Sequence, residues 1–198
     1  MYMFTALLLI LPLFSRTLYS APLLYRMKSD ASIIHFEGDS TLHAFKGYSR
    51  EVEGEAHFDP ETGETFLPET VHFKVRSLTT GNSRRDEAMY AMFQEKKYSE
   101  IEWRASSILC AEPDSSGSTS CEAEGILRMT GVEKPVNFTL KLSRQPGGLA
   151  VTGETLVTTD MFGLRPPSFL GLVKVSKNIR IHFQTIWLSG PSSASGKL

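Results

Sequence analysis

Apolar and polar side chains alternate along most of the chain between Tyr25 and Leu188. Successive side chains of a β-strand point to opposite faces of a sheet, so a period of two predicts strands with one dry face and one wet face. In residues 51–58, for example, Val52, Ala56 and Phe58 share one face, and charged or polar side chains occupy the other. Strands are predicted at residues 32–38, 51–58, 71–76, 101–105, 108–110, 122–129, 136–142, 149–158 and 179–184.

One segment, residues 83–93, breaks this alternation. Ser83 and Asp86 have the spacing of a capping box, which is typical of a helix start. The apolar residues that follow have helical spacing and would form one stripe: Ala88, Met89, Met92 and Phe93. About eight strands with little helix between them therefore predict an all-β fold, either an antiparallel β-barrel or a two-sheet sandwich, with one short α-helix near residues 84–93 laid across an open end or side of the sheet.

The composition is that of an ordinary globular domain, with 41% apolar and 22% charged residues. The 21 Lys and Arg residues against 22 Asp and Glu residues leave a formal net charge of -1. A protein that tracks phosphates along a nucleic acid usually carries a basic excess, so no nucleic-acid partner is expected.

The two ends of the chain differ from the alternating middle. Residues 1–20 contain an apolar run that is too short for a comfortable transmembrane helix, and they are predicted to be a secretory signal peptide cleaved after Ser20 or Ala21. A buried N-terminal helix or an uncleaved anchor is the alternative. Residues 21–189 form the predicted domain, and the Ser- and Gly-rich residues 190–198 are predicted to be a disordered tail.

Only two cysteines occur, Cys110 and Cys121, which are too few for a structural zinc site of cysteines alone. They flank a Ser- and Gly-rich stretch at residues 111–120 that is typical of a hairpin loop. After export to an oxidising compartment a disulfide could close this loop. Two unpaired thiols are the alternative that the sequence leaves open.

Motifs for catalysis or metal binding are absent from the sequence. The histidines are scattered, without an HExxH or CxxC pattern, and a cross-strand pair of His57 and His72 is interpreted as solvated rather than metal-binding. The sequence also lacks a Gly-x-Ser-x-Gly elbow and a phosphate-binding loop. We therefore expect a non-enzymatic protein with no catalytic residue, no metal ligand and no cofactor.

Four segments occur in the order seen in YceI-like proteins, and the chain resembles that family over about residues 23–188. They are STLHAFKG (40–47), LTTGNSRRDEAM (78–89), KYSEIEW (97–103) and GILRMTGVEKPV (125–136). Two positions depart from the family pattern: Ser99 replaces the usual proline, and the segment 158–163 lacks the usual arginine.

The resemblance implies a lipocalin-like antiparallel β-barrel that is exported to the bacterial periplasm and holds a long-chain isoprenoid or similar lipid. Membrane contact would then be only transient, and the sequence leaves a homodimer open. A barrel of about eight strands can hold one ligand or fill its interior with side chains. The alternative function is therefore a filled periplasmic accessory or stress-response protein that acts through its surface without a ligand.

An open tunnel is favoured by small residues on the dry faces, such as Gly54, Ala56 and Ala105, and by the flexible thioethers of Met89 and Met92. The residues expected to line it are Val52, Ala56, Phe58, Phe73, Val75, Met89, Met92, Phe93, Ile101, Trp103, Phe138, Leu140 and Phe183.

Arg84 and Arg85 lie in the first turn of the predicted helix, where backbone N–H groups are free. Together they could receive a phosphate or quinone head group. The alternative is a solvated first turn in which Arg85 pairs with a nearby carboxylate.

Overall fold

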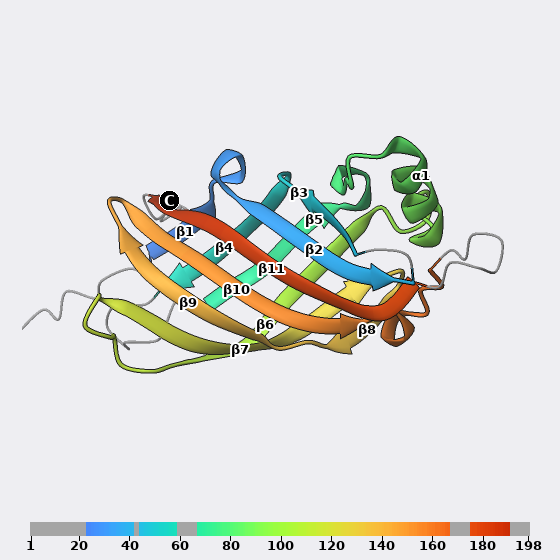
Figure 1. The fold of residues 1–198 in the computed structure, drawn as a ribbon. Helices are drawn as coiled ribbons and strands as arrows, with labels where there is room; N and C mark the ends of the chain where they lie inside the picture. The colour runs from blue at the N-terminus through green and yellow to red at the C-terminus, as the bar shows by residue number, and fades with distance from the viewer. Residues whose placement is uncertain (1–22, 42–43, 59–66, 167–174, 191–198) are drawn as a thin grey trace, which may run out of the picture.

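The computed structural model describes residues 23–41, 44–58, 67–166 and 175–190 (Figure 1). Its eleven strands form one antiparallel sheet. They are β1 (Leu23–Met27), β2 (Ile33–Ser40), β3 (Phe45–Ser49), β4 (Val52–Phe58), β5 (Leu67–Lys74), β6 (Glu100–Cys110), β7 (Ser118–Met129), β8 (Val132–Pro135), β9 (Phe138–Gln145), β10 (Gly148–Thr158) and β11 (Val175–Gly190). One α-helix, α1 (Ser83–Met92), and three short 3-10 helices, η1 (Ser29–Ala31), η2 (Val75–Ser77) and η3 (Thr159–Phe162), complete the described elements.

Eight of these strands close into a barrel in the order β1-β4-β5-β6-β7-β9-β10-β11, because β1 also pairs with β11. The first part of the long strand β11 pairs with β2, and its last residues pair with β1. The strands β1 and β2 therefore act as two halves of one N-terminal strand, separated by η1. This architecture confirms the predicted all-β antiparallel barrel of about eight strands with one helix.

The boundaries differ from the predicted ones in several places. The strands β1, β3 and β8 were not predicted, because four or five residues show too little alternation. Residues 101–105 and 108–110 belong to one strand, β6, whose pairing with β7 shifts between Ala105 and Ser107 and so interrupts the alternation. The predicted strand at 71–76 ends at Lys74, after which η2 begins.

The helix α1 lies over one end of the elongated barrel, and β11 ends at the other (Figure 1). The N-cap of α1 is Asn82, whose Oδ1 accepts a hydrogen bond from the backbone N–H of Arg85 at 3.1 Å. The predicted capping box of Ser83 and Asp86 is therefore wrong. Ser83 is already inside the helix, and Asp86 accepts hydrogen bonds from Thr79 and Thr80 in the preceding loop instead.

A disulfide joins Cys110 and Cys121, which lie directly opposite each other in the β6–β7 pairing with their Cα atoms 4.0 Å apart. It closes the hairpin at the barrel end opposite α1 (Figure 1).

The predicted signal peptide at residues 1–20 lies outside the described residues, as does the predicted tail except for Gly190, the last residue of β11. Among the residues that the structure describes, no helix has the length and apolar character needed to cross a membrane.

Candidate ligand-binding tunnel

A cavity of about 600 Å³ occupies the barrel interior beneath α1. The exposed residues Asn82, Arg84 and Arg85 line it at the start of the helix, so the tunnel reaches solvent at the α1 end. At its inner end lies Trp187, which is 2% exposed and packs so closely on Gly54 that a Cβ there would lie 2.8 Å from the indole Cη2. Ala56 and Cys121, nearer the disulfide end, are buried in the packed core and do not line the cavity. The tunnel is therefore open toward α1 and filled toward the disulfide.

Large aromatic side chains border this tunnel without filling it, because several of them lie against glycines on the neighbouring strand. A Cβ at Gly153 would come within 2.5 Å of Phe183 Cζ, and a Cβ at Gly38 would come within 2.6 Å of Phe45 Cζ. Both pairs are cross-strand neighbours. The rings of Phe183 and Phe45 therefore lie against the barrel wall at Gly153 and Gly38, and they border the cavity that remains open beside them.

The polar groups of the large interior side chains are bonded within the protein. Trp103 Nε1 donates to the Val136 carbonyl at 3.0 Å, and Trp187 Nε1 donates to Thr185 Oγ1 at 2.9 Å. Thr159 Oγ1, in η3, is the one buried side-chain polar atom without a hydrogen-bond partner among the described residues. Since the two indoles need no further acceptor, the inner part of the tunnel suits a ligand without polar groups.

Most of the residues expected to line a tunnel do line it. They are Phe73, Met89, Met92, Phe93, Ile101, Trp103, Phe138, Leu140 and Phe183, together with Arg84 and Arg85 at its mouth. The apolar stripe of α1, including Ala88, faces the cavity as a unit.

Three residues expected in the lining are buried elsewhere, and the structure corrects their placement. Val52 starts β4, where Ser29 of η1 donates a hydrogen bond to its carbonyl. Ala56 follows a register shift in the β4–β5 pairing and packs in the filled end. Val75 lies in η2, where strand alternation has ended. The side chain of Phe58 lies outside the described residues.

Other lining residues were missed. Ile34 and Phe36 in β2, Val151 and Val157 in β10, and Ile179 and Ile181 in β11 alternate within predicted strands, so the same pattern could have found them. Phe45 and Trp187 lie outside the predicted strands, and only their pairing in the barrel brings them to the cavity.

The loop before α1 holds the carboxylate of Asp86 in place through hydrogen bonds. Asp86 is 8% exposed and accepts hydrogen bonds from Thr80 N at 2.8 Å, Thr80 Oγ1 at 2.6 Å and Thr79 Oγ1 at 2.8 Å. Burial alone would raise the pKa of Asp86, but these hydrogen bonds outweigh it and lower the pKa below its usual value. Asp86 thus anchors the helix as a carboxylate.

Arg84 and Arg85 are exposed and form no ion pair with the described residues, so the carboxylate partner considered for Arg85 is not observed.

No group of three or more His, Cys, Asp or Glu side chains among the described residues is arranged to hold a metal ion. His57 Nδ1 lies 2.7 Å from Glu69 Oε1, and His72 Nε2 lies 3.6 Å from Glu53 Oε2, so the two histidines contact different glutamates.

The fold is shared with solved structures of low sequence identity. The Burkholderia cenocepacia protein BcnA has a TM-score of 0.68 and 14% identity, with 81% of this chain and 98% of that chain covered. A polyisoprenoid binding domain from Saccharophagus degradans implicated in plant cell wall breakdown has a TM-score of 0.67 and 14% identity, with 84% and 98% covered. The Campylobacter jejuni YCEI protein has a TM-score of 0.57 and 17% identity, with 73% and 84% covered.

Comparison with curated proteins gave no match. The family model described as YceI-like domain matches residues 25–186, which is most of the chain and nearly the whole barrel. The barrel, its α1-covered tunnel and this match together show that the chain belongs to the family of YceI-like domain proteins.

Proposed function

We propose that this protein binds a long-chain apolar ligand of polyisoprenoid type in its tunnel and carries it through an aqueous compartment without covalent chemistry. The observation that carries the proposal is the cavity of about 600 Å³, whose walls are apolar and whose indole N–H groups are already bonded. Ligand sites of a few hundred Å³ with such walls are typical of small-molecule binding. The name of the Saccharophagus degradans relative, a polyisoprenoid binding domain, supports the choice of ligand class.

The tunnel volume sets the length of tail that it could bury. At about 30 Å³ for each water-sized group, 600 Å³ holds on the order of 20 carbon groups. Each buried methylene contributes about 0.8 kcal/mol, so such a tail supplies roughly 16 kcal/mol of gross affinity before ordering costs. Since the disulfide end is filled, a longer tail would extend out through the mouth beside α1.

The mouth is where a head group would lie. Arg84 and Arg85 line the cavity and are exposed, which supports the prediction that they contact a phosphate or quinone head. Export by the segment 1–20, the periplasmic location and the carrier role belong to the same proposal. The alternative of a filled barrel acting through its surface is less well supported, because the cavity is large enough for a ligand.

Two measurements test the proposal: the lipid that co-purifies with the protein, and the binding of an added isoprenoid after delipidation. Protein purified without detergent should release a stoichiometric long-chain species into an organic extract, identified by mass spectrometry. After delipidation, geranylgeraniol should change the fluorescence of Trp103 and Trp187, the two tryptophans of the chain, because both line the tunnel. Repeated absence of a lipid together with unchanged fluorescence would contradict the proposal.

A further inference from the structure

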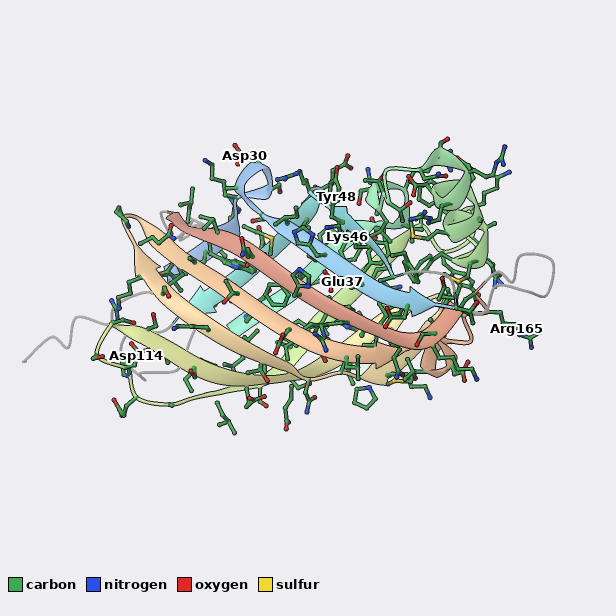
Figure 2. All side chains as sticks on the ribbon, viewed as in Figure 1. Asp30, Glu37, Lys46, Tyr48, Asp114 and Arg165 are labelled. Carbon is green, nitrogen blue, oxygen red and sulfur yellow. A yellow bond between two sulfur atoms is a disulfide. The ribbon has the colours of Figure 1, made fainter. Side chains whose placement is uncertain are left out.

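The end of the barrel at which the tunnel opens carries three arginines that form no ion pair with the described residues. Arg84 and Arg85 start α1, and Arg165 lies on the segment after η3 between Leu164 and Pro166, which both line the tunnel. Figure 2 shows Arg165 pointing outward from the same end of the barrel that α1 covers. All three guanidinium groups belong to exposed residues and form no ion pair with the described part of the chain. We call these three residues the arginine rim.

Neighbouring carboxylates offset part of the charge of the arginine rim, but none of them forms an ion pair with it among the described residues. Glu87 and Glu95 both approach Arg76, at 3.6 Å and 3.8 Å, and Asp160 pairs with Lys177. Asp86 is buried and hydrogen-bonded to the loop, and its carboxylate charge interacts with Arg85 without a direct ion pair. Asp39, near the end of β2, is exposed without an ion pair to a described residue and offsets part of the charge.

The arginine rim is exposed and without ion pairs to the described residues, although the chain as a whole has a net charge of -1. The opposite end of the barrel carries the loop residue Asp114, labelled at the far end from Arg165 in Figure 2, and Asp114 is paired with Lys141 at 3.9 Å. Unpaired arginines at the mouth would orient that end of the barrel toward an anionic surface.

We propose that the arginine rim docks the tunnel mouth on the surface of an anionic phospholipid bilayer, so that a ligand passes between membrane and tunnel without crossing water. The arginines would contact lipid phosphates, each as a charge-assisted hydrogen-bond donor. Phe45, Met92 and Pro166 are half-buried lining residues, and they would then face the acyl boundary. The proposal goes beyond ligand binding, because docking requires only the outer surface of the mouth and an empty tunnel docks as well as a loaded one.

Vesicle flotation tests the docking directly. The test compares vesicles of phosphatidylcholine with vesicles that also contain phosphatidylglycerol, using delipidated protein of the same N-terminal form for every variant. We expect the wild type to bind the anionic vesicles at about 0.01 M salt and to release them at about 1 M, where the screening length falls from about 30 Å to 3 Å. Arg84→Gln/Arg85→Gln/Arg165→Gln should weaken this binding by about fivefold per arginine, on the order of 100-fold in all.

A control variant changes the net charge equally at residues away from the mouth. Arg26→Gln/Arg104→Gln/Arg144→Gln removes three exposed arginines from β1, β6 and β9, so its vesicle binding should stay near wild type. Equal losses in the two triple variants would overturn the docking proposal, as would equal binding to neutral and anionic vesicles.

A single variant separates docking from recognition of the ligand head. Arg165 does not line the tunnel, so Arg165→Gln should weaken vesicle binding by about fivefold and leave the vesicle-free affinity for geranylgeraniol unchanged. If the arginine-rim variant binds vesicles like the wild type but loses affinity for a soluble isoprenyl phosphate, the arginines read the ligand head and docking is refuted. If vesicle binding follows the rim while no isoprenoid enters the tunnel, docking stands and the proposed ligand is wrong.

Discussion

Two valines allow a direct test of whether the barrel is open where the structure places the tunnel. Val151 in β10 lines the cavity and is 3% exposed, whereas Val52 in β4 is 0% exposed and lies away from it. Both are strand residues of the same type and nearly the same burial, so Val151→Phe and Val52→Phe make a matched pair. They differ in whether empty space lies next to the side chain.

The structure predicts opposite outcomes for the two variants. At Val151 the ring adds about four carbon groups, or roughly 120 Å³ at about 30 Å³ each, to a cavity of about 600 Å³. Excluding about four methylenes of a tail removes up to about 3 kcal/mol of gross binding free energy, on the order of 100-fold in affinity. At Val52 the ring has no room, and overpacking should cost about 1–3 kcal/mol of folding stability.

The assay measures both quantities on delipidated protein, since a bound lipid would itself raise the melting temperature. Val151→Phe should melt within a few degrees of the wild type and lose geranylgeraniol binding by tryptophan fluorescence. Val52→Phe should melt several degrees lower, at about 2–4 °C per kcal/mol for a chain of this size, and keep its affinity where folded. A strongly destabilised Val151→Phe with unchanged affinity would refute the tunnel.

Three further predictions concern the structure around the tunnel. Asn82→Ala should cost about 1 kcal/mol because it removes the observed N-cap, whereas Ser83→Ala should cost little, as chemical denaturation can show. Burial would raise the pKa of Asp86, but its hydrogen bonds outweigh burial and lower the pKa below 3.8. The contribution of Asp86 to stability is therefore complete above the unfolded-state pKa and is lost as the pH falls through the folded-state pKa. Asp86→Asn should accordingly flatten the fall in melting temperature below about pH 4. Replacing Cys110 and Cys121 by serine should lower the free energy of unfolding by about 3 kcal/mol, and an unchanged value would show that the loop closure contributes nothing.

The alternation of side chains along the sequence is by itself enough to determine most of the barrel. A period of two residues in the apolar pattern depends only on local strand geometry, because it determines which side chains of a strand share a face. For this reason the inward position of Phe73, Trp103 and Phe138 could be predicted from the sequence, and so could the stripe of α1 that faces the tunnel. Short strands such as β1 carry too weak a local signal, and at the helix start Asn82 and Ser83 are equally good N-cap residues by type, so the sequence does not decide between them.

Which inward side chains border empty space is decided only by the tertiary structure. In the sequence Gly54 indicates room in the barrel, but Trp187, more than 130 residues away in the chain, fills the space beside it. At Gly153 the ring of Phe183 lies against the wall, and there the interior stays open. A cavity depends on what faces a residue across the barrel, and that distance is set by strand pairing and register between remote segments. The pattern along one strand therefore determines the direction of a side chain and not the volume in front of it.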